Sequence, residues 1–213
     1  MPALVISIDG TDFSGKTTVA NLLVETLRNK NKDRKIIFKR TELPSTFVTG
    51  FFTRILRNSA DFVDSRVFAL TYALDHLHHF QKVIEPLKNS KDNFVIIQER
   101  SFLTCIVYQG LVGDVDLSWL KEINKFNKNV PDLTLILKAD IEELLKRKAL
   151  ENKDFDKFEL REHLEKQVGA YYNLPPDLAK FYNVEYVDAN KDITDIVNDC
   201  AERVQQKIDE FFK

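Results

Sequence analysis

The stretch that decides the fold is residues 4–17, which read LVISIDGTDFSGKT. Its first part, residues 4–8, is short, β-branched and almost entirely apolar, which is typical of a strand buried inside a parallel sheet. Residues 10–17 then match the pattern G-x-x-x-x-G-K-[ST] completely. A helical pattern follows over residues 16–29, so the motif has the strand before it and the helix after it that a phosphate-binding loop requires.

The residue types of this loop suit the binding of phosphates. Glycine at positions 10 and 15 lets the backbone turn its N–H groups inward without obstruction by a Cβ atom. Lys16 is expected to reach the outer phosphates of ATP, and the Thr17 hydroxyl to ligate Mg²⁺. An ordinary glycine turn that happens to carry a lysine is the alternative. The residues predicted to bind ATP are Gly10, Thr11, Asp12, Phe13, Ser14, Gly15, Lys16, Thr17 and Thr18.

Strand and helix patterns alternate along the rest of the chain. Further strands are predicted at residues 35–39, 93–98, 133–138 and 184–188, and helices at 47–57, 63–88, 101–111, 116–128, 140–149, 159–180 and 192–212. Such alternation predicts an α/β fold in which helices cover both faces of a parallel sheet. We expect the three-layer fold of P-loop NTPases, with a five-stranded parallel sheet in the order 2-3-1-4-5. The chain is predicted to form one domain over residues 1–213, with a charged, lid-like insert at about residues 148–158.

Composition narrows the classes of partner. The 213 residues carry a formal net charge of −2, whereas an extended nucleic-acid surface needs a surplus of basic residues. Two cysteines, Cys105 and Cys200, are too few and too far apart for a zinc site or a disulfide scaffold. The N-terminal apolar run is too short for a signal peptide or a membrane span. We therefore expect a cytoplasmic protein that binds small molecules, with neither nucleic acid nor a membrane as partner.

A second group of polar residues follows the predicted strand 93–98. There, residues 98–101 read QERS. The Glu99 carboxylate beside the loop can hold a metal-bound water, and Arg100 can direct a bidentate donor at a phosphate. A surface ion pair after a strand is the alternative. A GTPase should carry N-K-x-D after a later strand, but residues 137–140 read LKAD, so the amide that reads guanine is missing.

Taken in order, these motifs resemble the thymidylate kinase family over nearly the whole chain. Residues 99–101 stand in the place of the family's Asp-Arg-Tyr motif, with glutamate and serine as the departures. The segments YQG (108–110), PDLT (131–134), DFDKFE (154–159) and DAN (188–190) follow as in the family. The resemblance implies that Asp12 faces the 3′-hydroxyl of the acceptor sugar. It also implies that residues 154–159 form a lid and that Ala189 and Asn190 lie beside adenine.

The resemblance further implies an acceptor pocket. In the family, an aromatic residue of the third helix stacks on thymine, and an arginine four residues later bonds the edge of the base. Tyr72 and His76 hold these two positions here; core residues of an amphipathic helix are the alternative. The family's Arg-Glu-Pro loop appears as RTELP at residues 40–44, with the arginine displaced by one. The residues implied for acceptor binding are Asp12, Arg40, Glu42, Tyr72, His76, Arg100, Cys105 and Tyr108.

Phosphoryl transfer also needs positive charge at the moving group. Thymidylate kinases place an arginine either in the phosphate loop, after the aspartate, or in the lid, and Phe13 fills the first position here. We predict that Arg147 or Lys153, in or beside the lid-like insert, supplies this charge, with Lys157 a weaker candidate. A solvated charged face is the alternative.

The sequence thus predicts a kinase that transfers the γ-phosphoryl group of ATP to a nucleoside monophosphate, with dTMP favoured. Two alternatives stay open, which are another deoxynucleoside monophosphate kinase and a nucleotide-sensing protein with little turnover. The resemblance implies a homodimer, with residues 63–88 and 101–111 as its interface. The predicted catalytic residues are Lys16, Glu99, Arg100, Arg147 and Lys153, and the predicted Mg²⁺ ligands are Thr17 and Glu99.

Overall fold

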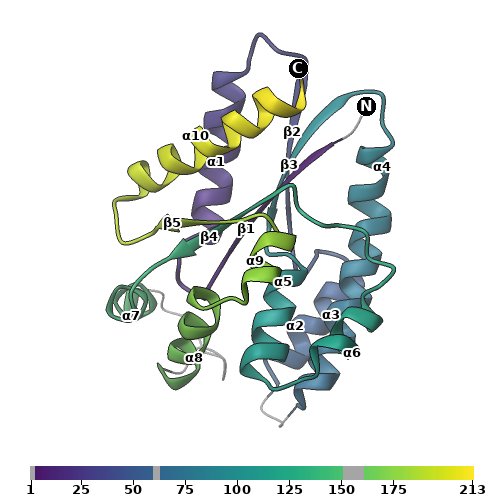
Figure 1. Ribbon diagram of the computed structural model, residues 1–213, viewed down its shortest axis with the longest axis vertical. Coiled ribbons are helices and arrows are strands. Elements are labelled where there is room, and N and C mark those ends of the chain that lie inside the picture. Colours follow the sequence, from purple (N-terminus) through teal and green to yellow (C-terminus); the bar gives the residue numbers. More distant parts are fainter. Residues whose placement is uncertain (1–2, 60–62, 151–160) are drawn as a thin grey trace.

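The computed structural model describes residues 3–59, 63–150 and 161–213. Its centre is a five-stranded parallel sheet in the order β2-β3-β1-β4-β5, so the predicted fold class and strand order are confirmed. Figure 1 shows the sheet in the middle of the molecule, with helices on both of its faces. The strands are β1 (Leu4–Gly10), β2 (Ile36–Glu42), β3 (Asn93–Glu99), β4 (Leu133–Lys138) and β5 (Val184–Asp188).

β1 occupies the centre of the sheet, and every one of its residues is buried. A strand between two neighbours, with helices over both faces, has to be apolar on both sides, which explains its nearly continuous apolar sequence. The parallel register pairs Ile8 with Glu99 of β3 and Gly10 with Leu137 of β4. The carboxyl ends of these three strands therefore meet at one edge, which is where ligands bind in sheets of this class.

Alternation of side chains along β1 divides the core between the two faces of the sheet. Leu4, Ile6 and Ile8 pack with α1 (Lys16–Lys30) and α10 (Ile193–Phe211). Val5 packs instead with Phe80 on the opposite face. α1 and α10 lie side by side in Figure 1, so the helix that follows the phosphate loop packs both on the sheet and against the last helix of the chain.

The remaining helices surround the carboxyl edge of the sheet and its second face. α2 and α3 pack against each other, and two π-helical segments, η1 and η2, continue α3 and α5. Among the described residues, no helix is both long and apolar enough to cross a membrane. The bounds are α2 (Val48–Arg57), α3 (Ser65–His79), η1 (Phe80–Ile84), α4 (Glu85–Lys88), α5 (Phe102–Cys105), η2 (Ile106–Val112), α6 (Leu117–Ile123), α7 (Ile141–Leu150), α8 (Arg161–Tyr172) and α9 (Pro176–Phe181).

Several predicted element boundaries were wrong. The helix predicted over residues 159–180 is interrupted, because a helix interior does not tolerate the Pro175-Pro176 pair; α8 ends at Tyr172, and Pro176 begins α9. α6 ends at Ile123 instead of residue 128. β2 runs on to Glu42 because its pairing with β3 continues to that residue. Of the predicted lid-like insert, the structure describes only residues 148–150, at the end of α7.

Candidate active site

The loop between β1 and α1 forms a cradle at the carboxyl edge of the sheet. Gly10 and Gly15 have φ angles of 139° and 92°, which side chains of other residues rarely allow. A Cβ atom at Gly10 would lie 2.9 Å from the Leu137 carbonyl oxygen. Gly15 is the N-cap of α1, and no side chain of the described residues caps this helix. The first N–H groups of α1 therefore stay available for an anionic ligand.

Lys16 lies in this cradle, and only 5% of its surface is exposed. Its Nζ atom donates a hydrogen bond of 2.6 Å to the Thr11 carbonyl oxygen and lies 3.9 Å from Oδ1 of Asp12. Burial, followed by the charge of Arg100, lowers the pKa of Lys16 to about 8. Phosphates placed beside the ammonium group would favour its charged form again, so this environment suits a lysine that binds an anion.

Thr17 and Glu99 meet at the opening of the cradle. The Thr17 hydroxyl donates a hydrogen bond of 2.8 Å to Oε1 of Glu99. Hydroxyl and carboxylate oxygens are ligands that suit Mg²⁺, so this pair fits the metal that the sequence predicted there. Both residues line a cavity of about 230 Å³. The full lining is Asp12, Phe13, Gly15, Lys16, Thr17, Thr18, Glu99 and Arg100.

Two arginines hold the carboxylate of Asp12. Arg57, the last residue of α2, donates to Oδ2 at 2.8 Å, and Arg100 donates to Oδ1. Burial alone would raise the pKa of Asp12, but the charges of Arg57, Arg100 and Lys16 hold it far below its usual value. The sequence did not point to Arg57, because no local pattern shows that the end of α2 comes to rest against the phosphate loop.

The backbone directs Arg100 towards this carboxylate. Arg100 has a φ angle of 65°, and such a left-handed conformation costs a non-glycine residue about 1–3 kcal/mol. Two hydrogen bonds stabilise it: the Arg100 N–H donates to the Ile8 carbonyl at 2.9 Å, and the Gln98 side chain donates to the Arg100 carbonyl at 2.7 Å. The guanidinium carbon lies 5.6 Å from the centre of the Tyr108 ring. Arg100 and Tyr108, predicted for the same site, are therefore neighbours.

Two of the predicted base-reading residues lie together on α3. The ring centres of Tyr72 and His76 are 6.1 Å apart, and the His76 ring lies 6.0 Å from that of Phe102 on α5. His76 is only 3% exposed. Cys105 is buried in an apolar cluster between α3 and α6. The structure thus brings Tyr72 and His76 together beside α5, and Cys105 belongs to the buried cluster against which Tyr72 packs.

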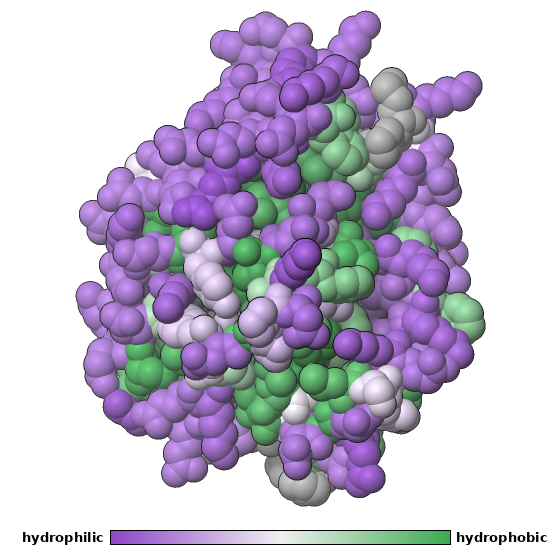
Figure 2. Space-filling model, viewed as in Figure 1, coloured by the Kyte–Doolittle hydropathy of each residue, from purple (hydrophilic) through white to green (hydrophobic). Residues whose placement is uncertain are grey.

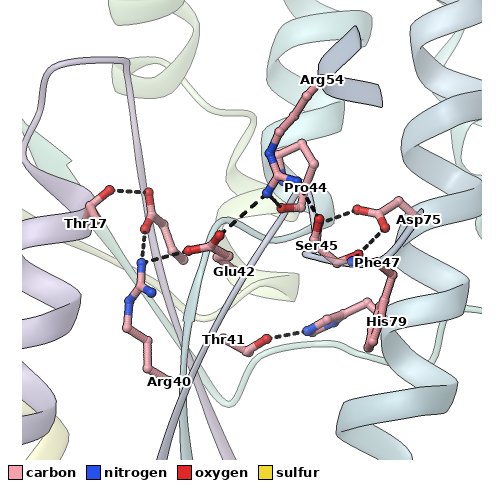
Figure 3. Close-up of polar contacts among 11 residues, drawn as sticks. Thr17, Arg40, Thr41, Glu42, Pro44, Ser45, Phe47, Arg54, Asp75 and His79 are labelled. Atoms are coloured by element: carbon pink, nitrogen blue, oxygen red, sulfur yellow. Dashed lines mark hydrogen bonds and ion pairs between the residues drawn. The ribbon is translucent and has the colours of Figure 1, made fainter. Parts of the chain in front are cut away.

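Arg40 and Glu42 lie close to Glu99, at the end of β2. Arg40 Nη2 is 2.8 Å from Oε2 of Glu99 and 3.0 Å from Oε2 of Glu42, and Figure 3 shows Arg40, Glu42 and Thr17 in this line of contacts. Arg40 therefore contacts Glu99 of the Thr17–Glu99 pair, and Glu42 contacts Arg40, whereas the resemblance had grouped both residues with Tyr72 and His76. A role of Arg40 and Glu42 in acceptor binding stays a prediction.

Arg147 joins the phosphate loop to the loop after β5. Its guanidinium donates to the carbonyl oxygens of Ser14 at 3.2 Å and Ala189 at 2.7 Å, and to Glu143 at 2.8 Å. Ala189 is buried and Asn190 is exposed. Arg147 therefore lies at the edge that is predicted to hold adenine, with backbone carbonyls as its partners. The other two candidates for the catalytic charge, Lys153 and Lys157, lie outside the described residues.

A larger cavity has in its wall Phe102, whose ring lies 6.0 Å from that of His76. Its volume is about 570 Å³, and its walls include Phe102, Leu178 and Tyr182. Figure 2 shows apolar side chains near the middle of the viewed face, with hydrophilic ones around them. The lining of this cavity contains none of the residues that the sequence predicted for the site. The smaller cavity at the phosphate loop therefore remains the candidate active site.

Two buried histidines of α3 are expected to make the stability of the protein depend on pH. Burial lowers the pKa values of His76 and His79 from 6.5 to about 4, and for His79 the neighbouring His76 adds to the effect. Between about pH 4 and pH 6.5, the unfolded chain binds protons that the folded protein does not bind. The stabilisation is therefore complete above about pH 6.5 and is lost as the pH falls towards 4.

We expect the free energy of unfolding, measured by urea denaturation, to fall steeply between about pH 6.5 and pH 4. His79→Gln should flatten this slope, because glutamine does not titrate and can still bond the Thr41 hydroxyl, which lies 2.5 Å from Nε2 of His79. Equal slopes in the wild type and the variant would show that His79 is not a source of the pH dependence.

Comparison with known proteins agrees with this geometry. The family described as thymidylate kinase matches residues 8–200. Probable thymidylate kinase 1 of Saccharolobus solfataricus is 32% identical over 204 residues, which are 96% of this chain and 98% of the relative. The probable thymidylate kinase of Methanocaldococcus jannaschii is 31% identical over 188 residues, 88% of each chain. The crystal structure of thymidylate kinase from Ehrlichia chaffeensis has the same fold, with a TM-score of 0.69 and 24% identity over 96% of this chain and 100% of that one. The family match spans both the phosphate loop and the Glu99-Arg100 pair, and the chain belongs to the thymidylate kinase family.

Proposed function

We propose that the protein, as one domain over residues 1–213, transfers the γ-phosphoryl group of ATP to dTMP, giving dTDP and ADP. The observation that carries this proposal is the 2.8 Å hydrogen bond between Thr17 and Glu99. It joins a hydroxyl of the phosphate-loop helix to a carboxylate of the neighbouring strand, in a cavity that Lys16 and Arg100 also line. Membership of the family supports the choice of substrate, since the relatives are named thymidylate kinases.

The charges of the site suggest how the residues divide the work. Lys16 and the N–H groups at the start of α1 bind the phosphates of ATP. Thr17 and Glu99 would hold Mg²⁺, which offsets the negative charge of those phosphates when it is bound. Arg100 grips phosphate near the point of transfer, and Asp12, held beside it, receives the sugar of the acceptor. Positioning and charge compensation, which this arrangement provides, are the main requirements of phosphoryl transfer.

The choice of base is assigned to Tyr72 and His76. Tyr72 offers a ring on which a base can stack. His76 is neutral at pH 7, because burial lowers its pKa to about 4. A neutral imidazole presents a single donor or acceptor to the edge of a base, whereas arginine presents a fork of donors. We therefore expect dTMP to be favoured over other pyrimidine monophosphates by a smaller margin than an arginine would give.

The proposed function is tested by measuring ADP release from MgATP over a panel of nucleoside monophosphates. ADP that forms only when an acceptor is present identifies a kinase, and the largest kcat/KM among dTMP, dUMP and dCMP identifies its substrate. A preference for an acceptor other than dTMP would indicate another deoxynucleoside monophosphate kinase. Tight ATP binding without turnover of any acceptor would instead indicate a nucleotide sensor.

A second copy of the chain is proposed as partner. α2 carries exposed apolar residues at helical spacing, and α3 beside it carries three more. Adjacent apolar faces of this kind mark interaction surfaces. Residues 102–110 of the other predicted interface segment are buried, apart from the half-buried Phe102, so α2 replaces that segment in the proposal. The surface comprises Val48, Phe51, Phe52 and Ile55 of α2 and Val67, Leu70 and Leu74 of α3.

We expect Phe51→Asp to convert the dimer into a monomer, because it places a charge at the centre of the proposed interface. Molecular mass measured by sedimentation equilibrium at micromolar concentration tests this expectation. Phe126→Asp is the matched control, since Phe126 is 65% exposed but lies after α6, outside the proposed surface. A wild-type protein that is monomeric under these conditions would rule out the dimer.

A further inference from the structure

The two faces of β2 make different contacts at the end of the strand. Successive side chains of a strand point to opposite faces, so Arg40 and Glu42 share one face, and Thr41 lies on the other. Thr41 contacts His79 of α3, with 2.5 Å between its hydroxyl oxygen and Nε2. Arg40 contacts Glu99, which in turn accepts from Thr17 of α1. The position of the arginine in the strand therefore directs it to the metal-binding pair (Figure 3).

Glu99 has a donor on each of its carboxylate oxygens. Thr17 donates to Oε1 and Arg40 to Oε2, both at 2.8 Å. The side chains of Arg40 and Glu99 are 26% and 13% exposed, so this ion pair is shielded from water better than a surface pair. Charge-assisted hydrogen bonds in such surroundings restrict a side chain more strongly than neutral ones. Without Arg40, only the Thr17 hydroxyl would remain of these two donors.

A neighbouring carboxylate gives Arg40 a second anionic partner in this place. The register of β2 and β3 pairs Glu42 directly with Glu99, and like charges on neighbouring strands repel each other. Arg40 Nη2 lies 3.0 Å from Glu42 and 2.8 Å from Glu99, so one cation separates two anions. Glu42 is in addition 3.5 Å from Arg54 of α2, and this contact holds it from the other side.

We propose that Arg40 is a positioning residue for the metal-binding pair: it holds Glu99 towards Thr17 and offsets the charge of Glu42. This inference rests on the proposed function, because it assigns Arg40 to the Mg²⁺ side of that site and not to the acceptor. An acceptor-binding role and a positioning role of Arg40 differ in their effects on two quantities, the KM for dTMP and the affinity for the metal. A residue that binds the acceptor would change the KM for dTMP, whereas a positioning residue for Glu99 changes the affinity for the metal.

The first test measures metal binding without turnover. Mn²⁺ binding to the complex of the protein with ADP, followed by electron paramagnetic resonance, should weaken roughly 10- to 100-fold in Arg40→Met. Arg40→Lys should lose less, because it keeps the charge but loses the guanidinium geometry. Arg28→Met is the matched control, since Arg28 donates to the carbonyl of Phe38 on the same strand and lies outside the site. Unchanged or tighter Mn²⁺ binding in Arg40→Met overturns the proposal.

The second test uses double variants. If Arg40 acts by offsetting Glu42, then Glu42→Gln added to Arg40→Met should restore much of the lost Mn²⁺ affinity. If Arg40 acts through Glu99, then Arg40→Met should have little further effect in a Glu99→Gln background. The KM for dTMP should stay within about twofold in Arg40→Met, and a large rise in this KM with normal Mn²⁺ binding would assign Arg40 to the acceptor instead. Wild-type ADP formation is measured first, so failure of the proposed function is seen separately.

Discussion

Replacing Lys16 with alanine is expected to lower kcat by about a hundredfold or more while the protein stays folded. Lys16 is the buried ammonium group of the phosphate cradle, and it would face charge on the phosphates throughout the reaction. Its removal leaves the Thr11 carbonyl without the 2.6 Å hydrogen bond from Nζ. Steady-state kinetics on a protein whose melting temperature has been checked therefore gives the relevant comparison.

A control for this substitution lies on the same helix. Lys30 is the exposed last residue of α1, and Lys30→Ala should leave kcat unchanged. Lys16→Met keeps most of the aliphatic stem and separates loss of charge from loss of packing. If folded Lys16→Ala and Lys16→Met turned over at nearly the wild-type rate, the cradle would not be the donor site.

The second large effect is expected in the lid-like insert. Lys153→Ala should lower kcat by a few hundredfold and leave the KM for ATP almost unchanged, because a group that acts only in the closed complex stabilises the transition state. Arg147→Ala should behave differently. Its guanidinium bonds the carbonyls of Ser14 and Ala189, so its loss should raise the KM for ATP about tenfold, with a smaller change in kcat.

Kinetic constants for the two variants, measured side by side, distinguish these roles. A strong loss of kcat in Arg147→Ala with normal ATP affinity would transfer the catalytic charge to Arg147. The charge would be placed outside the lid if kcat changed less than fivefold in each of the three single variants, Arg147→Ala, Lys153→Ala and Lys157→Ala.

The strands could be predicted from the sequence because their signals are local, whereas their order in the sheet followed from the fold class that the phosphate-loop motif indicates. A short apolar run before the phosphate loop is typical of a buried strand, and β4 and β5 have the bounds that their patterns predicted. Helix ends were less predictable. Periodicity does not register a change from α- to π-helical hydrogen bonding, as in η2, and the Pro175-Pro176 pair interrupts a helical pattern that continues on both sides of it.

The site could be predicted where one motif supplies it, and not where distant elements meet. The phosphate loop places Lys16 and Thr17 by its own backbone. By contrast, the contact of Arg57 with Asp12 spans 45 positions and depends on how α2 packs. The direction of Arg40 depends on the end of β2, which the sequence had predicted to stop at residue 39, before this arginine. Only within a strand does alternation fix the face on which a side chain lies.

The cations around Asp12 also bear on how nucleotides arrive. Lys16, Arg57 and Arg100 lie about a single carboxylate, so this spot is locally positive on a chain whose formal net charge is −2. A focused positive potential attracts polyanions and accelerates their encounter with the site. Salt shortens the reach of such a field from about 30 Å at 0.01 M to about 8 Å at 0.15 M. The rates at which nucleotides associate with the protein should therefore fall as the ionic strength rises. The salt concentration thus affects how quickly nucleotides bind again to the emptied site.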